Sequence, residues 1–409
     1  MKDVYDILKQ RGFIEQVTNE QALIQALGGQ ITCYAGFDPT GSSLHVGHLL
    51  PIMALAHMQR AAHRPIILLG GGTALIGDPS GRDKMRRILS QEEVADNTRK
   101  IKKQFSKYID FGGKNKALIL NNAEWLVSIR YIEFLRDIGK HFSVNRMIAA
   151  ESYKMRLEAG LNFIEFNYML LQAYDFLQLY QNYQCILQIG GNDQWGNILA
   201  GIDLVRKAAG GTAYGLTFPL ITTATGSKMG KTEKGAIWLD AEITSPYKFY
   251  QYWINTDDRD VERFLAFFTF LSMDEIAGYV GEGANSMQKA KEILAFEATS
   301  ITHGKTEAIK ARKSSRSVFY GNGKSLDSLP TTVIERERLK KGIAAFIIFE
   351  ETELCKTRSE ARRLINEGGA YINGTRLKVF DEKVDESYII DGVILLRAGK
   401  KKYHKILLK

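Results

Sequence analysis

The sequence predicts an α/β protein with a doubly wound parallel sheet, a helical domain after it and a small α+β module at the C-terminal end. Three observations lead to this prediction. Short apolar runs alternate with helical patterns in the first half, residues 246–320 carry helix formers without strand-like runs, and a Gly- and Ser-containing segment separates the remainder. Alternating strands and helices are typical of βαβ units, whose helices cover both faces of a parallel sheet.

Four apolar runs mark the expected strands. They comprise residues 30–37, 65–69, 117–120 and 185–189, with helical patterns between them. Ligands of open parallel sheets bind beyond the carboxyl ends of the strands. The residues that follow these runs are therefore the first candidates for a functional site.

The same patterns divide the chain into four segments. We expect a sheet domain over residues 1–225, a mobile loop and helical domain over 226–320, a linker over 321–340 and a small module over 341–409. The Gly, Asn and Ser residues at 321–328 are typical of a linker.

Composition excludes several classes of protein. The chain has 409 residues, a formal net charge of +9 and 45% hydrophobic residues, which is enough for two or three domains with real cores. No apolar run approaches the ~20 residues that span a membrane, and the first residues lack a signal-peptide pattern, so we expect a cytoplasmic protein. Cys33, Cys185 and Cys355 form no C-x-x-C pair; we interpret each as a small buried hydrophobe and expect neither disulfides nor a thiolate metal site.

A turn rich in Pro, Gly and Ser follows the first apolar run and leads into His45-Val46-Gly47-His48. Helix N-termini attract phosphates through free N–H groups and the helix dipole. Two imidazoles three residues apart would lie on one helical face there, and Gly47 would let a ligand approach the backbone. A zinc site and a purely structural role are the alternatives, but no further metal ligand lies nearby. Alone, the motif indicates nucleotidyl transfer without choosing a substrate.

A second basic motif, Lys228-Met229-Gly230-Lys231-Thr232, lies between Gly226 and Gly235. Such glycines favour a mobile loop, and two ammonium groups can reach a leaving pyrophosphate. Loops of this kind act on the transition state more than on the ground state. A solvated lysine pair is the alternative, and the upstream His motif argues against it.

A polar helical face suggests a ligand pocket. Tyr168, Gln172 and Asp175 are spaced i, i+4 and i+7, and burying such groups without partners costs about 1–3 kcal/mol each. Gly190-Gly191-Asn192-Asp193 after an apolar run suits close contact with a ribose, and Asp78 follows a glycine turn. A solvated face is the alternative. The run 70–72 lacks the G-x-G-x-x-G spacing of a dinucleotide site.

Both basic motifs are similar to the signatures of class I aminoacyl-tRNA synthetases, which usually read His-Ile-Gly-His and Lys-Met-Ser-Lys-Ser. This chain differs at Val46, Gly230 and Thr232 and keeps both imidazoles and both ammonium groups. Segments 34–40, 77–81, 171–176 and 245–247 further resemble bacterial tyrosyl-tRNA synthetases, and the resemblance extends over essentially the whole chain.

The resemblance implies a role for each matching residue. Tyr34 and Asp175 would bind the phenolic hydroxyl of tyrosine, Asp78, Tyr168 and Gln172 its ammonium group, while Gln188 and Gln194 would lie near its carboxylate. ATP would be bound by Asp38, Thr40, Gly47, His48, Gly191, Asp193 and Lys231. Catalysis on the phosphates would involve His45, His48, Thr40, Lys228, Lys231, Thr232, Arg82 and Arg86, although the family often has lysine where Arg82 stands. With Asp175 ionised, phenylalanine would leave a buried charge unpaired.

The last residues are basic. From residue 352 onward, 13 Lys and Arg face 8 Asp and Glu, a net charge of +5, which suggests nucleic acid. Segments 355–365 and 368–374 resemble the small RNA-binding domain shared with the fourth protein of the small ribosomal subunit. The pattern predicts one basic face on a short helix, and the expected tRNA contacts are Arg358, Arg362, Arg363, Lys400, Lys401 and Lys402. A solvated basic face is the alternative.

The resemblance implies activation of L-tyrosine by ATP to tyrosyl-adenylate, then transfer to the 3′ end of tRNA(Tyr), without a covalent enzyme intermediate. ATP would be a substrate accompanied by Mg²⁺, with no bound organic cofactor. The family further implies a homodimer with residues 121–158 at its interface, and a tRNA anticodon-arm site in the helical domain. Three alternatives stay open: a tryptophanyl-tRNA synthetase, a small-molecule nucleotidyltransferase, and a non-enzymatic RNA-binding protein.

Overall fold

The computed structural model describes residues 3–80, 87, 89–149, 153, 160–224, 226, 229–232, 235–281, 284–320, 329–390, 392–399 and 402–409. Only the backbone is described at 231–232, 284–285 and 317–320. The chain divides into two compact units, one of residues 1–244 with 252–302 and one of residues 245–251 with 303–409.

The first unit is built on a six-stranded sheet with the order β1-β6-β5-β2-β3-β4. Five of the strands are parallel, and β1 lies antiparallel to β6 at the edge. The strands are β1 (Gln16–Val17), β2 (Thr32–Phe37), β3 (Arg64–Leu69), β4 (Leu118–Asn121), β5 (Cys185–Gly191) and β6 (Tyr214–Phe218). The predicted parallel sheet is therefore confirmed, and all four expected strands are present. Sequence analysis missed β1 and β6.

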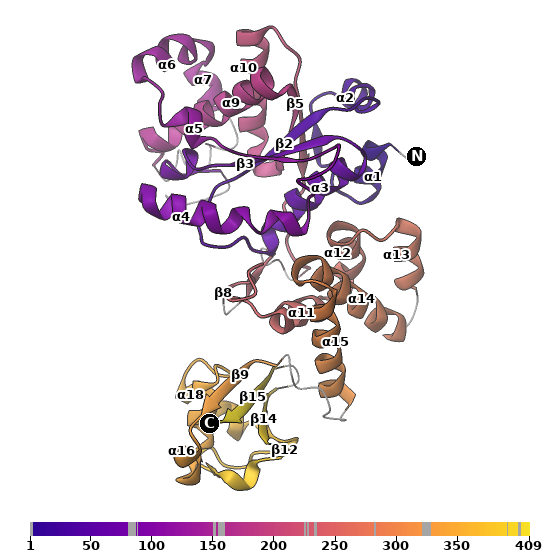
Figure 1. Cartoon of the computed structure of the whole chain (residues 1–409), viewed down its shortest axis with the longest axis vertical. Coiled ribbons are helices and arrows are strands. Elements are labelled where there is room, and N and C mark those ends of the chain that lie inside the picture. Colours follow the sequence, from indigo (N-terminus) through magenta and orange to yellow (C-terminus); the bar gives the residue numbers. More distant parts are fainter. Residues whose placement is uncertain are drawn as a thin grey trace. The chain divides into compact units, whose positions relative to one another are not determined.

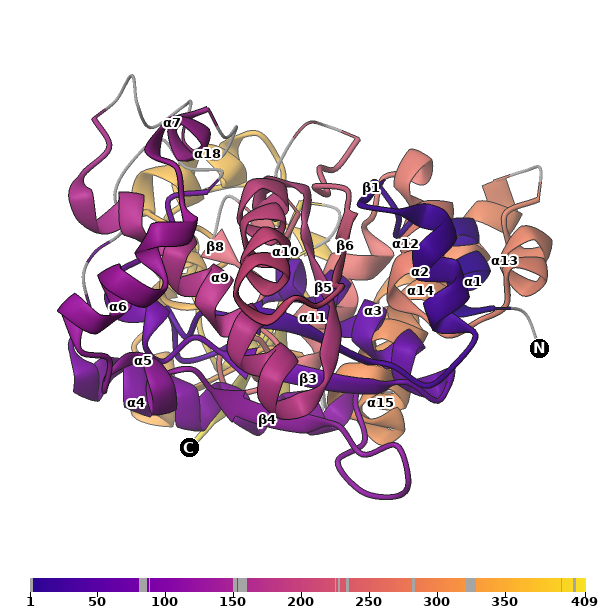
Figure 2. The same cartoon turned by 90° about the horizontal axis from the view of Figure 1, so that it is seen from above.

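Helices cover both faces of this sheet (Figures 1 and 2). The long helices α9 (Phe163–Tyr183) and α10 (Trp195–Ala209) pack together on one face, and α3 (Leu49–Arg60) and α4 (Gln91–Lys102) lie on the other. β2 and β3 are accordingly almost fully buried, as expected for strands covered on both sides. Further α-helices among the described residues before β5 are α1 (Val4–Gln10), α2 (Glu20–Leu27), α5 (Ala123–Leu126), α6 (Tyr131–Asp137) and α7 (Val144–Ile148).

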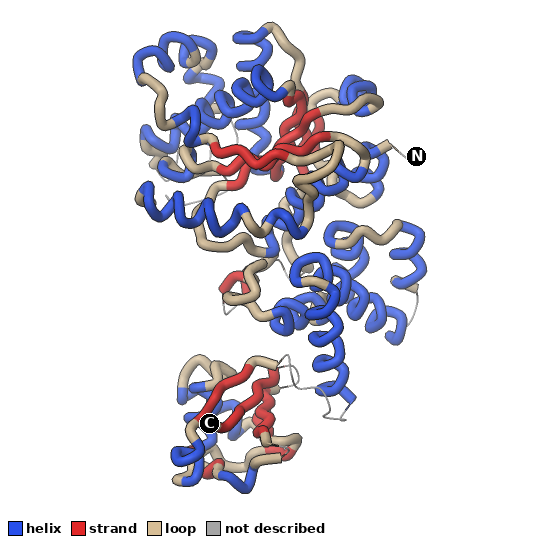
Figure 3. The backbone as a smooth tube through the Cα atoms, viewed as in Figure 1, coloured by secondary structure: helices blue, strands red, loops and turns tan. Residues whose placement is uncertain are grey.

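The described part of the expected helical region after residue 245 contains helices joined by loops and no strand (Figure 3). Its helices are α11 (Pro246–Ile254), α12 (Val261–Phe268), α13 (Met273–Tyr279), α14 (Ala284–His303) and α15 (Lys305–Tyr320), with a 3₁₀ turn η6 (Asp258–Asp260) before α12. The fully buried Trp253, Phe264, Phe267 and Phe268 form an aromatic cluster among them. A short hairpin of β7 (Lys231–Thr232) and β8 (Gly235–Ala236) precedes this region.

The C-terminal module has its own core beneath a five-stranded sheet of order β12-β11-β14-β15-β9. Its strands are β9 (Thr331–Ile334), β11 (Ala370–Ile372), β12 (Thr375–Arg376), β14 (Val393–Ala398) and β15 (Lys402–Leu408), with β10 (Ile343–Ala344) pairing β13 (Lys383–Val384) separately. Its helices are α16 (Arg336–Lys340), α17 (Ala345–Glu351) and α18 (Arg358–Asn366). Residues 331–340, expected within the linker, instead belong to this fold because β9 pairs with β15.

The three cysteines are buried and free of disulfides, as expected. Burial raises the pKa of the Cys33 thiol to about 12, so this side chain stays a neutral thiol. Among the described residues, no helix is both long enough and apolar enough to cross a membrane.

Candidate active site

A cavity of about 560 Å³ lies where β2 and β5 end. Tyr34 of β2 and Gln188 of β5 are register partners on these adjacent strands. The sheet continues through β3 and β4 on one side and through β6 on the other, so the cavity lies at the switch point of the strand order, where such sheets bind ligands. The expected site residues that line it are Tyr34, Asp38, Thr40, His45, Gly47, His48, Asp78, Tyr168, Gln172, Asp175, Gln188, Gly191, Asp193 and Gln194.

One end of the cavity is built to receive a hydroxyl group. The Tyr34 side chain is 1% exposed, and its buried hydroxyl has no hydrogen-bond partner among the described residues. The Asp175 carboxyl is also buried, and it contributes to raising the pKa of Tyr34 well above the usual value, after burial itself. A buried polar group without a partner is costly, so the Tyr34 hydroxyl favours a ligand that forms a hydrogen bond with it, beside a buried carboxyl.

Asp175 is held by two donors that sequence analysis missed. Asn122 donates from Nδ2 to Oδ2 at 2.9 Å, and Trp125 donates from Nε1 to Oδ1 at 2.7 Å. Burial raises the pKa of Asp175 to about 7 although both donors lower it. The carboxyl is therefore balanced between its two charge states near neutral pH, and not simply ionised as the sequence argument assumed. Both donors directly follow β4, the position where site residues were expected.

A network of amides and carboxylates forms the opposite side of the cavity. Gln194 donates to Asp78 at 2.8 Å, and Asn197 donates to Gln172 at 3.0 Å and to the Gln194 side-chain oxygen at 3.2 Å. The Tyr168 hydroxyl donates to Asp38 at 3.1 Å. The predicted polar face of residues 168–175 on α9 is thus confirmed as cavity lining, and its groups are oriented by neighbours.

Asn197 at the centre of this network is a second residue that sequence analysis missed. It is 1% exposed, and its own Oδ1 has no partner among the described residues. It follows Gln194 by three residues at the start of α10, so both amides fall on one helical face. The three-residue spacing of Gln194 and Asn197 is visible in the sequence and could have identified Asn197 as a site residue.

The His45-Val46-Gly47-His48 motif forms a tight 3₁₀ turn, η1 (Val46–His48), before α3. The His48 Nδ1 accepts the backbone N–H of His45 at 3.1 Å, and the His45 Nδ1 accepts that of Gly47 at 3.0 Å. An Nδ1 that accepts a hydrogen bond leaves the proton of a neutral imidazole on Nε2. The turn therefore orders both rings, 4.0 Å apart between centroids, as Nε2 donors beside the cavity.

Glycine at position 47 has a geometric cause in addition to the expected ligand approach. A Cβ there would lie 2.7 Å from Cε1 of the His45 ring. No real Cβ contact is that short, so any side chain would displace the ring.

The glycines at 70–72 also serve the site, although they form no dinucleotide motif. A Cβ on Gly70 would lie 1.9 Å from the Asp38 carboxylate, and one on Gly71 would lie 2.2 Å from Asn121 Oδ1. The Gly72 N–H donates to Asn122 Oδ1 at 2.7 Å. The run lets the polar side chains of neighbouring strand ends approach the backbone closely.

The described part of the lysine motif packs against the histidine motif. A Cβ on Gly230, whose φ is +79°, would lie 2.5 Å from Val46 Cγ2. The Gly230 carbonyl accepts the N–H of Ile237, whose own carbonyl accepts the N–H of Val46. Lys228, Arg82 and Arg86 lie outside the described residues, and for Lys231 and Thr232 only the backbone is described.

The arginines of α18 do not lie on one face, contrary to expectation. Arg358 pairs with Glu350 of α17 at 3.0 Å, and the Arg362 guanidinium stacks over Phe346 of α17, 4.2 Å from the ring centroid. Arg363 instead lines a separate cavity together with Lys402. Lys400 and Lys401 lie outside the described residues.

Comparisons with known proteins agree with this geometry. A family model described as class I tRNA synthetases (W and Y) matches residues 26–320, and a model described as a tyrosine--tRNA ligase SYY-like C-terminal domain matches residues 323–406. The chain therefore belongs to the class I tRNA synthetases of the tryptophan and tyrosine group.

The curated proteins with similar sequences are named for tyrosine. The chain is 55% identical to a protein named tyrosine--tRNA ligase from Desulfatibacillum aliphaticivorans, with 99% of each chain covered, and 53% identical to one from Caldanaerobacter subterraneus, again with 99% of each covered. Among solved structures, a C-terminally truncated mitochondrial tyrosyl-tRNA synthetase of Aspergillus nidulans is 32% identical, with a TM-score of 0.71 over 78% of this chain and 95% of that chain. A tryptophanyl-tRNA synthetase of Encephalitozoon cuniculi, 16% identical with a TM-score of 0.53, shares the fold.

Proposed function

We propose that this protein is an enzyme that activates L-tyrosine with ATP, releases pyrophosphate, and transfers tyrosine from tyrosyl-adenylate to the 3′ end of tRNA(Tyr). The observation that carries the proposal is the buried pair of Tyr34 and Asp175 in the lining of the cavity: the Tyr34 hydroxyl has no hydrogen-bond partner among the described residues, and each Asp175 oxygen accepts one hydrogen bond and can accept another. A phenol hydroxyl can donate to the Asp175 carboxylate and accept from Tyr34. Phenylalanine can do neither.

The rest of the amino acid fits the opposite side of the cavity. Asp78, Tyr168 and Gln172 would hold the ammonium group, since all three offer oxygen atoms and line the same cavity. Gln188, whose buried Oε1 has no described partner, and Gln194 would lie near the reacting carboxylate. Asn197 would orient Gln172 and Gln194 through the hydrogen bonds that it donates to both.

ATP would lie beside the η1 turn. Asp38, Thr40, Gly47, His48, Gly191 and Asp193 would surround its ribose and phosphates, with Lys231 supplied by the lysine motif. Mg²⁺ would accompany the ATP phosphates, because proteins ordinarily hold this ion through substrate phosphates and few ligands of their own.

In the first step, the tyrosine carboxylate attacks the α-phosphorus and pyrophosphate leaves. The Nε2 donors of His45 and His48, with Lys228, Lys231, Thr232, Thr40, Arg82 and Arg86, would stabilise the charge that builds on the phosphates. In the second step, a terminal ribose hydroxyl of the tRNA attacks the activated carbonyl. Catalysis then comes from positioning and charge stabilisation, without a covalent enzyme intermediate.

Tyrosine-dependent exchange of pyrophosphate into ATP tests this function. We expect exchange with tyrosine, and rates lower by orders of magnitude with phenylalanine and tryptophan as controls. Charging of tRNA(Tyr) should follow under the same conditions. No exchange with tyrosine would refute the proposal, and preference for tryptophan would reassign the pocket.

Tyrosine affinity should depend on pH through Asp175. The phenol donates to the ionised carboxylate, and the pKa of Asp175 in the empty protein is about 7. Protonation below this pKa removes the acceptor, so the Kd for tyrosine should rise about tenfold between pH 8 and pH 6. Fluorescence titration of binding measures this directly. A flat profile over this range would contradict the assigned role, and Asp175→Asn should flatten the profile.

We also propose that the C-terminal module binds tRNA, as its net charge of +5 supports. Arg363 is exposed and beside Lys402, whereas Arg362 stacks on two aromatic rings. Arg363→Ala should therefore weaken tRNA binding and lower the salt-dependence slope by about 1. Arg362→Ala should instead destabilise the protein by about 1 kcal/mol through the lost cation–π contact. Filter binding at several salt concentrations and thermal melting separate these effects; the opposite pattern would exchange the two roles.

A homodimer is proposed around residues 121–158. Seven large apolar side chains in and beside this segment are 40–72% exposed: Val127, Tyr131, Ile132, Val144, Ile148, Phe163 and Ile164. Patches of this kind mark association surfaces. Ile132→Asp should shift the protein towards monomer in sedimentation experiments, and an unchanged dimer would place the interface elsewhere.

We further propose a cytoplasmic location, and an anticodon-arm site within residues 226–320.

A further inference from the structure

The backbone on either side of Lys228 is held by side chains from the helices that follow. We name residues 222–224 and 229–230 the loop root. Three side chains contact it: Tyr252 at the end of α11, Asp260 at the end of η6 and Arg263 in α12. All of these residues belong to the first compact unit.

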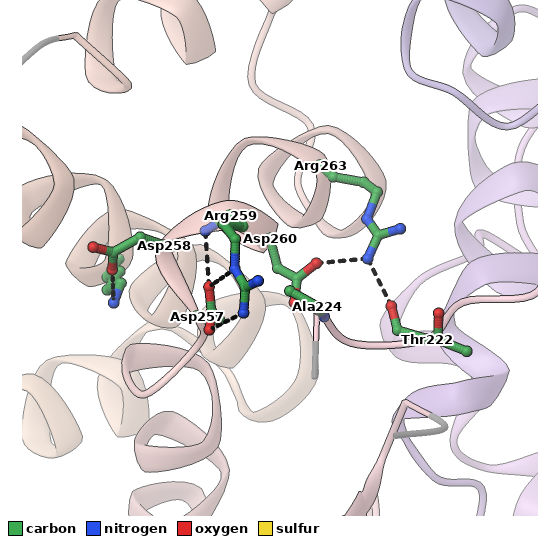
Figure 4. A network of polar contacts seen from close by, with 8 residues as sticks. Thr222, Ala224, Asp257, Asp258, Arg259, Asp260 and Arg263 are labelled. Carbon is green, nitrogen blue, oxygen red and sulfur yellow. Dashed lines mark hydrogen bonds and ion pairs between the residues drawn. The ribbon is translucent and has the colours of Figure 1, made fainter. Parts of the chain in front are cut away.

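Asp260 and Arg263 hold the entry to the lysine motif. Asp260, with a side chain only 4% exposed, accepts the backbone N–H of Ala224 at 2.7 Å and a hydrogen bond from Arg263 at 2.6 Å. Arg263 also donates to the carbonyl of Thr222 at 2.7 Å (Figure 4). A buried carboxylate is costly unless it is paired and hydrogen-bonded. The loop root supplies one partner of the Asp260 carboxylate, the N–H of Ala224. The other partner, Arg263, also donates to the loop root at the carbonyl of Thr222.

Tyr252 holds the opposite end of the loop root. Its hydroxyl accepts the backbone N–H of Gly230 at 3.2 Å. Gly230 is also the residue that packs on Val46 with a positive φ. The Tyr252 contact therefore acts where the lysine motif meets the histidine motif.

The helix that carries Arg263 is itself firmly attached. Arg11, 6% exposed, donates to the carbonyls of Ala266 at 2.6 Å and Thr269 at 3.0 Å, at the C-terminal end of α12. By contrast, the neighbouring Arg259 pairs with Asp257 at 2.8 Å, and its side chain is 66% exposed. The contacts to the loop root are thus a specific feature of Asp260 and Arg263 within this charged segment.

We propose that Tyr252, Asp260 and Arg263 are positioning residues for the activation step, because they fix both ends of the segment that carries Lys228. The inference rests on the proposed function, in which the lysines act on the departing pyrophosphate. These residues touch neither substrate nor reacting atoms. They act through the backbone, and a small misplacement of a catalytic group is enough to slow a reaction markedly.

The test compares Tyr252→Phe and Arg263→Ala with two matched controls in the full-length protein. Arg259→Ala removes a neighbouring guanidinium, and Tyr279→Phe removes a phenol hydroxyl from α13. We expect the first two variants to lower the kcat of tyrosine-dependent ATP–pyrophosphate exchange about five- to tenfold, equivalent to about one lost hydrogen bond each. Their Kd for tyrosine should stay that of the controls, and so should the melting temperature of Tyr252→Phe. Arg263→Ala leaves the buried Asp260 carboxylate without its cationic partner, so this variant should melt at a lower temperature and is assayed well below it. Amide hydrogen exchange at Ala224 should accelerate in Arg263→Ala, and that at Gly230 in Tyr252→Phe.

Asp260 offers a graded comparison. Asp260→Asn keeps an acceptor for the Ala224 N–H, so it should lose less activity than Asp260→Ala. If both Asp260 variants fail to fold, Tyr252→Phe still decides the matter, since it deletes a single oxygen atom. A kcat equal to that of the controls overturns the inference, and so does a parallel loss of tyrosine affinity. If the unmodified protein shows no tyrosine-dependent exchange, the proposed function itself fails and this inference fails with it.

Discussion

Asp175→Asn is expected to lower kcat/KM for tyrosine activation by about 100-fold, corresponding to about 3 kcal/mol for a lost buried hydrogen bond to a charged group. Asn122 and Trp125 direct N–H donors at both carboxyl oxygens of Asp175. An asparagine has only one acceptor oxygen, so its amide NH₂ must face one of these donors in either orientation. The substitution therefore removes the acceptor for the phenol and disturbs the groups that place it.

Selectivity should change together with rate. The Asp175→Asn pocket no longer contains the carboxylate that accepts the hydrogen bond from the phenol, so tyrosine loses its advantage and the ratio of kcat/KM for tyrosine over phenylalanine should fall. Pyrophosphate exchange with both amino acids measures this ratio. Asp96→Asn is a suitable control, because Asp96 forms exposed ion pairs on α4. Unchanged rejection of phenylalanine by an active Asp175→Asn enzyme would show that Asp175 does not read the hydroxyl.

The two donors to Asp175 allow a finer experiment. Trp125→Phe keeps an aromatic ring and removes the Nε1–H donor. Since that hydrogen bond lowers the pKa of Asp175, its loss should raise the pKa above 7. The pH dependence of tyrosine binding should then move to higher pH.

Gly47→Ala is expected to lower the kcat of pyrophosphate exchange by about 100-fold, the size of effect typical for loss of one preorganised donor to a developing charge. The added Cβ would lie 2.7 Å from the His45 ring. The ring must move, and the hydrogen bond from the Gly47 N–H to Nδ1 is lost. The Nε2 donor then no longer faces the phosphates.

Tyrosine binding should survive this change, because the atoms nearest to a Cβ on Gly47 belong to His45 and Met229 and not to Tyr34 or Asp175. We expect a Kd for tyrosine within about twofold of the unmodified value, so the loss would fall on kcat. Gly278→Ala is the matched control: a Cβ there meets nothing within 4 Å on α13. A Gly47→Ala enzyme with normal kcat would show that the ordered His45 ring contributes nothing to the transition state.

Much of the candidate site could be predicted from the spacing of residues in the sequence. The i, i+4, i+7 spacing of Tyr168, Gln172 and Asp175 was sufficient because a helix longer than two turns places such residues on one face whatever surrounds it. The strands before Asp38 and Gly191 were recognisable because both faces of a central parallel strand are buried, which leaves a continuous apolar run. β1 is a two-residue edge strand and carries no such run. β6 is paired on both sides and largely buried, but Gly215 and Thr217 interrupt its apolar run, so it also escaped detection.

Other features required contacts between segments far apart in the chain. Asn122 and Trp125 are about fifty residues away from Asp175 in the sequence. No local sequence pattern predicts hydrogen bonds between residues so far apart. The same holds for β9, whose residues resemble a linker until β15 pairs with them. Helix geometry turns the adjacent Arg362 and Arg363 to different sides, and tertiary packing decided what each one meets: Arg362 stacks on Phe346 of α17, and Arg363 lines a cavity with Lys402.

By itself, the sequence determined the order of strands and helices, the two basic motifs and the polar face of α9, because these depend on local periodicity and residue chemistry. Only the tertiary structure decided which side chains share the cavity and how burial shifts the pKa of Asp175. The pKa of Asp175 and the attachment of the loop root to Asp260 both arise from burial and from distant partners. Distance and desolvation, which set these energies, exist only once the chain has folded.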